Sequence, residues 1–281
     1  MNKKNKSLIE THLAVLLFGI SGLFGKLLSM NPMIIVFGRV LFSSIFLFII
    51  ILILKKSLRL KSQHYFHLII MGIVLAIHWS TFFKSIQMST VAIGLLTFST
   101  FPIFITFIEP YFFKEKIKSS DIISAIITFT GILLVIPKFE IGSMMGVLWG
   151  ILSGFTYAIL SILNKRYVME YSSITIAFYE QIIATIILFP FFFIQKPIFS
   201  NRDIVLLVIL GVIFTGISHL LFINGLKNIK AHTAGIISSL EPVYGIFFAA
   251  LLLKEIPSIR EILGGILIFS TVVYTTIRIK K

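Results

Sequence analysis

The sequence predicts an all-α integral membrane protein with ten transmembrane helices, arranged as two inverted five-helix repeats. Three observations support this prediction: ten hydrophobic stretches of similar length, a composition with few charges, and basic residues concentrated in alternate connections. A helix rises about 1.5 Å per residue and a bilayer core is about 30 Å thick, so one crossing needs about 20 apolar residues. The stretches are residues 8–28, 33–54, 66–86, 91–113, 120–137, 144–164, 173–194, 203–223, 233–253 and 260–278.

The composition excludes a soluble protein. Of the 281 residues, 57% are hydrophobic and only 13% are charged, whereas a water-facing domain is about one quarter charged. The longest polar connection, residues 55–64, is too short to fold alone, so we expect no cofactor-binding or catalytic domain outside the membrane. Cysteine is absent, which excludes disulfides and thiolate metal sites. Residues 1–6 are basic, but the next stretch is long enough to span, so no cleaved signal peptide is expected.

The formal net charge of +14 predicts topology and not a nucleic-acid partner, because the cations lie in short loops beside hydrophobic stretches. Counting from the N-terminus, alternate connections carry 17 Lys and Arg residues, and the other connections carry five. Cytoplasmic loops are enriched in Lys and Arg. We therefore expect a multi-pass protein of the cytoplasmic membrane (the inner membrane, where a cell has two) with both termini in the cytoplasm.

An internal repeat appears when the chain is shifted by 140 positions. Pro102 then falls on Pro242, and Lys114–Glu115 falls on Lys254–Glu255, without a gap. Each copy has five hydrophobic stretches, an odd number, so the second copy enters the membrane upside down relative to the first. We assign the first repeat to residues 1–141 and the second to residues 142–281.

The pattern of residues resembles a known family. Leu17–Phe18–Gly19, Lys26 and Arg39 precede the repeated Pro and Lys–Glu positions, and each repeat ends in a glycine-bearing stretch. Over its whole length the chain resembles the EamA type of the drug/metabolite transporter superfamily. It departs from the family in that last stretch, where one of two usual glycines is replaced in each repeat by Ser124 and Thr271.

The resemblance implies a secondary active transporter, an exporter or exchanger of small metabolites such as amino acids, that works by alternating access. Inverted repeats suit that mechanism because the two halves can exchange conformations. Efflux of drugs or other cationic compounds is the alternative. The resemblance implies no cofactor, and the partners would be a small-molecule substrate, the lipid bilayer and, if transport is proton-linked, protons.

Three cations lie within hydrophobic stretches of the first repeat: Lys26, Arg39 and Lys84. Charges inside a bilayer cost a few kcal/mol each. All three lie toward the predicted outer side, where the first repeat has no acid, so they could form a mouth that attracts anions. The other interpretation is that the long side chains extend to the lipid headgroups. Arg39 lies deepest and is retained as a candidate substrate-binding residue.

Glu241 is the acidic candidate. Pro242 removes the helical hydrogen bond to the Ser238 carbonyl, which predicts a kink one turn from a carboxylate. The carboxylate, the freed carbonyl and the Ser238 hydroxyl could bind a proton, a cation or a substrate amine. The equivalent position in the first repeat holds Phe101 and so lacks the charge, but Thr97 is among the hydroxyl residues that precede Pro102. A kink used for packing alone is the alternative.

Aromatic and imidazole side chains complete the candidate site. His78 and His219 lie near the middle of the third and eighth stretches, and either could titrate for proton coupling or form one hydrogen bond between helices. We retain His219. Trp79 and Tyr157 are retained because the family resemblance places them on helices that line the cavity.

Glycines recur at every fourth position in the sixth stretch, at Gly146, Gly150 and Gly154. Such a stripe predicts close contact with a neighbouring helix.

Two other functional classes lack the motifs they need. An intramembrane enzyme would need a pattern such as His-Glu-x-x-His, Gly-x-Ser-x-Gly or paired intramembrane aspartates, and none occurs. A channel would need a filter loop or a ring of like charges. The sequence leaves open the substrate, the direction of transport, the coupling ion and whether the protein forms a homodimer.

Overall fold

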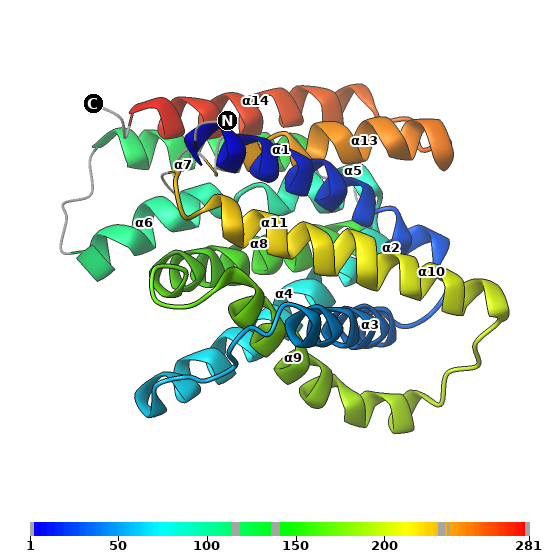
Figure 1. Ribbon diagram of the computed structural model, residues 1–281. Coiled ribbons are helices and arrows are strands. Elements are labelled where there is room, and N and C mark those ends of the chain that lie inside the picture. The colour runs from blue at the N-terminus through cyan, green and yellow to red at the C-terminus, as the bar shows by residue number, and fades with distance from the viewer. Residues whose placement is uncertain (1–2, 114–118, 136–140, 230–233, 235–236, 279–281) are drawn as a thin grey trace.

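The computed structural model describes residues 3–113, 119–135, 141–229, 234 and 237–278. All regular structure within these ranges is helical, and the helices form one bundle (Figure 1). The Lys114–Glu115 pair of the repeat lies outside the described residues. In the first repeat the elements are α1 (Lys3–Ser21), α2 (Phe24–Leu27), α3 (Pro32–Ile53), η1 (Ser62–His64), α4 (Tyr65–Met88), α5 (Val91–Phe98), α6 (Phe101–Phe113) and α7 (Ser119–Val135).

The second repeat contains elements that correspond to those of the first. The ten hydrophobic stretches predicted from the sequence all fall on helical segments, which confirms the predicted all-α membrane fold. The elements of the second repeat are α8 (Ile141–Tyr167), α9 (Ser173–Gln195), α10 (Asn201–Gly211), η2 (Val212–Ile217), α11 (Ser218–Gly225), α13 (Glu241–Leu252) and α14 (Ile259–Arg278).

Among the described residues, seven helical segments are both long and apolar enough to cross a bilayer by themselves. Shorter apolar helices cover Ala125–Val135 and Glu241–Leu252. The seven longer segments are Lys3–Leu27, Pro32–Ile53, Ser62–Met88, Val91–Ile108, Gly142–Tyr167, Ser173–Gln195 and Asn201–Gly225.

Local sequence fixes several helix starts. The Asn31 side chain accepts a hydrogen bond of 2.9 Å from the Met33 amide, and Pro32, which has no amide hydrogen to lose, begins α3. Thr90 caps α5 through the Ile93 amide at 3.0 Å. These caps satisfy amides that would otherwise lack partners inside a membrane.

The packing of the helices follows the internal repeat. Helix α4 packs on α8, and its counterpart segment, η2 with α11, packs on α1. The pairs α3 with α9 and α7 with α14 join equivalent helices of the two halves. In Figure 1, α7 begins at the left of the bundle and α14 ends there, so these equivalent helices run in opposite directions. The two repeats are therefore inverted relative to each other.

Three crossings are interrupted near the middle of the bundle. Helix α5 ends at Phe98 and α6 starts at Phe101, and the equivalent segment of the second repeat has a turn at Ser239 and Leu240 before α13. The sequence predicts kinks at these places, and the structure shows two-residue turns that end one helix and begin the next. Between α10 and α11, the segment η2 is wound as a π-helix. Interrupted helices inside a membrane expose backbone groups that can bind ligands.

Candidate functional site

A small cavity lies between the two repeats at the level of these interruptions. It has about 20 Å³ of free space, enough for about one water molecule, so the cavity is closed around its own side chains. Five of the seven residues predicted to bind substrate line it. The lining residues are Phe18, Ser21, Arg39, Leu75, His78, Trp79, Phe82, Phe98, Tyr157, His219 and Glu241.

Arg39 is the cation of this cavity. Its side chain is only 1% exposed, and its guanidinium carbon lies 3.9 Å from the centre of the Trp79 ring, in a cation–π contact. The Nε atom donates a hydrogen bond of 2.9 Å to the Thr215 hydroxyl. The Nη1 atom is buried without a partner among the described residues. Arg39 therefore keeps one strong donor free for a ligand.

Glu241 is the acid of the same cavity. It is 6% exposed and is the first residue of α13, whose backbone dipole favours a negative charge at this end. Pro242 follows in the first turn of the helix, where the missing amide hydrogen costs nothing. Arg39 and Glu241 both line the cavity but form no direct ion pair within the described part of the chain.

Gly19 allows α1 to approach the start of α13. A Cβ atom at Gly19 would lie 2.8 Å from the Glu241 carbonyl oxygen and 3.0 Å from the Gly245 nitrogen, which is closer than side-chain carbons normally come. This contact packs the start of α13, in the second repeat, against α1 of the first repeat. The position of Glu241 therefore depends on both halves.

His219 and Glu180 form a buried pair beside the cavity. His219 Nε2 lies 2.6 Å from Glu180 Oε2, and the His219 ring meets the edge of the Trp79 ring at a centroid distance of 5.7 Å. Glu180 is fully buried. Glu180 in α9 lies within one residue of the position that corresponds to Arg39 of α3 in the 140-residue repeat. Opposite charges therefore stand at equivalent places in the two repeats.

The other histidine of the cavity has a different environment. His78 Nδ1 lies 3.0 Å from the Ser153 carbonyl oxygen and 2.9 Å from the Ser153 hydroxyl, on α8. This contact is the hydrogen bond between helices that the sequence analysis offered as an alternative to a titrating role.

The two remaining candidates, Ser238 and Thr97, are not among the residues that line the cavity. Ser238 is buried beside the Tyr157 phenol, but its hydroxyl makes no well-directed hydrogen bond to the described residues. The Thr97 hydroxyl bonds to the Ile93 carbonyl of its own helix at 2.7 Å and faces Gly150. Thr97 is thus a packing residue in this conformation.

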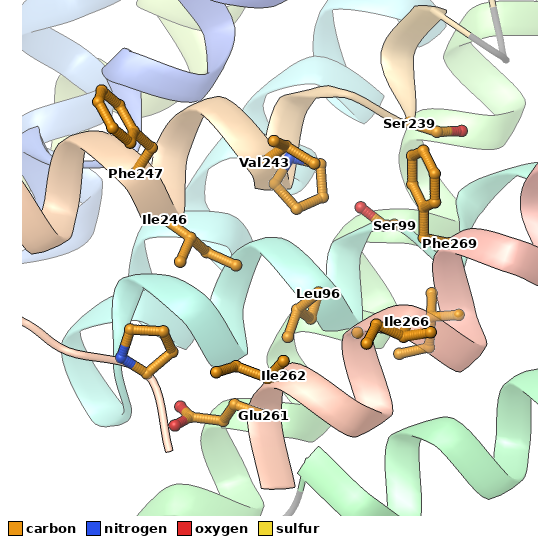
Figure 2. A pocket seen from close by; sticks show the side chains of 14 residues that line it. Leu96, Ser99, Ser239, Val243, Ile246, Phe247, Glu261, Ile262, Ile266 and Phe269 are labelled. Atoms are coloured by element: carbon orange, nitrogen blue, oxygen red, sulfur yellow. The ribbon is translucent and has the colours of Figure 1, made fainter. Parts of the chain in front are cut away.

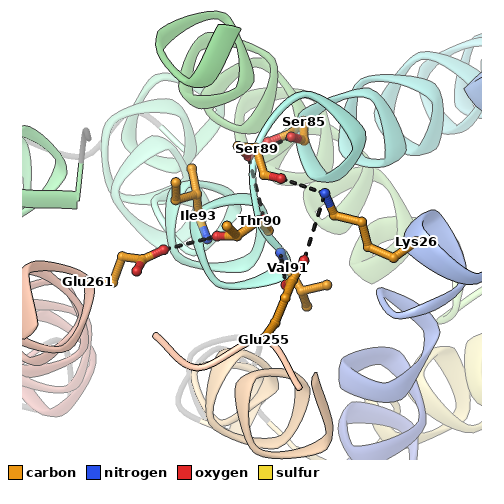
Figure 3. Close-up of polar contacts among 8 residues, drawn as sticks. All are labelled: Lys26, Ser85, Ser89, Thr90, Val91, Ile93, Glu255 and Glu261. Carbon is orange, nitrogen blue, oxygen red and sulfur yellow. Dashed lines mark hydrogen bonds and ion pairs between the residues drawn. The ribbon is translucent and has the colours of Figure 1, made fainter. Parts of the chain in front are cut away.

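The predicted positive mouth is wrong, because Lys26 pairs with an acid of the second repeat and Arg39 lies in the central cavity. Lys26 Nζ lies 3.8 Å from the Glu255 carboxylate and donates a hydrogen bond of 2.6 Å to the Ser89 carbonyl (Figure 3). Arg39 lies in the central cavity instead, and Lys84 has an exposed side chain. The sequence analysis compared charges within one repeat only, whereas the structure brings both repeats together here.

Glu255 and Glu261 also hold the start of α5. Glu255 accepts a hydrogen bond of 2.9 Å from the Val91 amide, and Glu261 accepts one of 3.0 Å from the Thr90 hydroxyl (Figure 3). We call the end of the bundle that carries Lys26 and Glu255 the Lys26 face. At this face the second repeat is tied to the first by charge-assisted hydrogen bonds.

The other end of the bundle, which we call the Lys61 face, is also bridged between repeats. Lys61 donates a hydrogen bond of 3.0 Å to Glu170. This bond and the attraction of the two charges raise the pKa of Lys61 and lower the pKa of Glu170. His64 Nδ1 lies 2.6 Å from the Tyr171 hydroxyl. Contacts between the repeats therefore exist at both faces of the closed cavity.

A larger cavity of about 390 Å³ lies away from this site, between α5, α13 and α14 (Figure 2). Its walls are apolar, and Phe247 and Ile266 are 63% and 56% exposed on its rim. Its one carboxylate, Glu261, is engaged by Thr90. Because exposed apolar rims face lipid in a membrane protein, the central cavity, which holds the buried Arg39 and Glu241, is kept as the candidate functional site.

Thr215 is a site residue that sequence reasoning missed. Its hydroxyl accepts from Arg39 and donates to the Leu210 carbonyl, five residues earlier, at 2.7 Å. That spacing belongs to the π-helix, which no local sequence signal predicts. The pairing of the buried Glu180 with His219 also depends on the tertiary fold.

Comparison with known proteins gives the family. Residues 7–136 and 144–277 each match the EamA-like transporter family. The chain belongs to this family. One EamA match falls on each half of the internal repeat, in agreement with the resemblance seen in the sequence and with the inverted packing.

Named relatives of this EamA-like chain are transporters. It is 25% identical over 284 residues to the "Uncharacterized transporter YxxF" of Bacillus subtilis, covering 98% of this chain and 91% of the relative. It is 23% identical to the "S-adenosylmethionine uptake transporter" of Rickettsia conorii, covering 88% and 83% of the two chains. A solved crystal structure superposes with a TM-score of 0.71 at 14% identity, over 98% of this chain and 97% of the other, which shows a shared fold.

Proposed function

We propose that the protein is a secondary active transporter of a small zwitterionic metabolite, such as an amino acid or a compound with an amino-acid group. The observation that carries the proposal is the pair of buried opposite charges, Arg39 and Glu241, which line one cavity without bonding to each other. A buried charge needs a partner. A substrate carboxylate would supply one for Arg39, and a substrate amine would supply one for Glu241.

The aromatic walls suit the same class of substrate. Trp79 and Tyr157 offer flat apolar surfaces beside the two charges. Three relatives are named S-adenosylmethionine uptake transporters. S-adenosylmethionine has an amino-acid group, a sulfonium cation and an aromatic ring, so it belongs in the first set of compounds to test. Efflux of a cationic compound would use Glu241 and the aromatic walls but would leave Arg39 without a function.

Alternating access follows from the inverted repeats. The cavity lies between the halves, and the contacts between them at the Lys26 face and the Lys61 face can break in turn. From the distribution of Lys and Arg we propose that both termini and the Lys61 face are cytoplasmic, in the cytoplasmic membrane, and that the repeat boundary lies between residues 141 and 142.

The proposal is tested with purified protein in liposomes. Uptake is measured for labelled neutral amino acids and for S-adenosylmethionine. It is also measured for the amine that corresponds to each amino acid without its carboxylate. Loss of a hydrogen bond to a charged group costs about 1.5–3 kcal/mol, or roughly ten- to hundredfold in affinity. Arg39→Gln should weaken uptake of the complete amino acid by that factor and leave the amine nearly unchanged, while Glu241→Gln should weaken both.

The matched control is Lys84→Gln, which removes an exposed cation from the neighbouring part of the same repeat. It should transport as the parent protein does. An equal loss for both substrates in Arg39→Gln would make Arg39 a structural residue and contradict the zwitterion proposal, and preferred transport of a quaternary amine would favour cation efflux.

A further inference from the structure

The pair formed by Glu180 and His219 has no part in the binding of substrate charges described above. Glu180 is 0% exposed and His219 is 3% exposed. Their contact of 2.6 Å joins α9 to α11. Glu180 Oε1 has no partner among the described residues, and the same is true of both polar atoms of the neighbouring Gln181 side chain. A carboxylate oxygen buried without a partner is costly, so its presence calls for an explanation.

The position of the pair gives it contact with the substrate cavity. His219 lines the cavity and contacts the Trp79 ring, and the Arg39 guanidinium stacks on the face of that ring. Arg39 bonds to Thr215, one helical turn before His219. A charge on the His219–Glu180 pair would therefore act at short range, and through a low dielectric, on Arg39 and Glu241, which would hold the substrate.

Polar residues lead from the pair toward the Lys61 face. Asn224, further along α11, donates a hydrogen bond of 2.8 Å to Glu10 and accepts one of 3.2 Å from Ser173 at the start of α9. The Glu10 side chain is 13% exposed and lies 3.8 Å from Lys6, whose side chain is 63% exposed. These polar groups lie on α11, α9 and α1 and lead to the solvent-exposed Lys6.

We infer that Glu180 and His219 form a proton-binding site, separate from Arg39 and Glu241, that takes up and releases one proton in each transport cycle. With one proton between them the carboxylate and the imidazole are neutral overall. An incoming proton forms an O–H bond at Glu180 Oε1, while the proton shared with His219 stays in place, so the pair gains one positive charge. Release to solvent reverses the step.

The consequence is coupling to the substrate. The charged and titratable groups that line the cavity with His219 are Arg39 on α3, His78 on α4, Tyr157 on α8 and Glu241 on α13, and Glu10 on α1 lies beyond Asn224. A positive charge gained by the pair strengthens the attraction for a substrate carboxylate in the cavity. This inference rests on the proposed transport function for its role in the cycle, but the proton site itself can be tested without any substrate.

The direct test is infrared difference spectroscopy of purified full-length protein between pH 6 and pH 9, in water and in heavy water. Exposed carboxyl groups stay ionised in this range because they titrate near pH 4. The Glu241→Gln protein serves as background. It should show a pH-dependent band of a protonated carboxyl group together with a shift of the band of the imidazole bonded to it, and adding Glu180→Gln should remove the carboxyl band.

Histidine variants supply the matched control. His219→Gln should remove the coupled imidazole signal, whereas His78→Gln, a buried histidine that faces Ser153 and no carboxylate, should retain it. Size-exclusion profiles identify any variant that fails to fold. If only one of the Glu180→Gln and His219→Gln proteins folds, that variant alone is enough for the test. The inference would be overturned if the spectrum of the background protein did not change with pH. It would also be overturned if the pH change of the background protein persisted unaltered in both the Glu180→Gln and the His219→Gln proteins.

Transport assays separate this inference from the proposed function. With the labelled amino acids and S-adenosylmethionine, Glu180→Gln should lose at least tenfold in accumulation driven by a pH gradient and should keep exchange of labelled for unlabelled substrate. Full accumulation by Glu180→Gln would overturn the coupling role. If the parent protein transports none of these compounds, the proposed function fails, and the infrared result still decides whether the proton site exists.

Discussion

At the scale of single residues, Arg39 shows how a charge is made tolerable inside a bundle. Its guanidinium is stacked on Trp79 and held by Thr215, and its Nη1 atom is buried without a partner among the described residues. Sequence analysis selected Arg39 because a charge within a hydrophobic stretch needs a reason. It could not select Thr215, because a threonine in an apolar helix usually bonds to its own backbone.

Thr215 should contribute to stability through its hydroxyl. Thr215→Val keeps the shape of the side chain but leaves Arg39 Nε buried without an acceptor, which costs about 1–3 kcal/mol. The free energy of unfolding of the purified protein in detergent should fall by that amount. Thr215→Ser keeps the hydroxyl and should remain within about 1 kcal/mol of the parent protein. Equal losses in the two variants would show that the methyl group, and not the hydrogen bond, is what matters.

At the scale of helices, the breaks and the glycine contacts determine the site. The repeated prolines indicated where the fourth and ninth crossings change direction, but not that α13 would begin at Glu241. The extent of a break depends on neighbours, such as Gly19 against the Glu241 carbonyl. The π-helical turn of η2 is likewise fixed by α3, because Gly211 and Gly216 allow Phe42 and Ser43 to approach closely.

The glycine stripe of α8 gives a prediction at this scale. A Cβ atom at Gly150 would overlap the Thr97 hydroxyl and lie 2.9 Å from the Ser85 hydroxyl, whereas one at Gly142 would meet only the Met88 carbonyl oxygen at 3.9 Å. Overpacking costs about 1–3 kcal/mol. Gly150→Ala should lower the free energy of unfolding by that amount. Gly142→Ala, on the same helix, should be neutral or stabilising by up to about 1 kcal/mol. Equal effects would contradict the packing shown here.

At the scale of the whole molecule, the sequence predicts much of the fold. The lengths of the hydrophobic stretches and the 140-residue offset between the repeats each depend on many residues, so single substitutions do not obscure them. It predicts five residues of the cavity for a similar reason: charged and aromatic groups are unusual at the centre of a bundle. Lys26 was misread because its partner, Glu255, belongs to the other repeat. Contacts between repeats depend on how the halves dock, which no pattern within one repeat contains.

The inverted arrangement predicts opposite exposure of equivalent loops. The chain has no cysteine, so single cysteines can report on each loop. Ser119→Cys at the start of α7 and Ser258→Cys before α14 lie at exposed positions. In intact cells, an impermeant maleimide should label Ser258→Cys and should reach Ser119→Cys only after the membrane is opened. Labelling of both from the same side would contradict the inversion.

The central claim is that one cavity between the repeats opens to each side of the membrane in turn. Ser21 lines the cavity and is 4% exposed, so Ser21→Cys is the most direct reporter. Its labelling by an impermeant maleimide is measured in oriented vesicles from each side separately, with and without the transported amino acid. We predict labelling from both sides and protection by substrate on both. Labelling from one side only, whatever the substrate concentration, would contradict alternating access and with it the proposed transport mechanism.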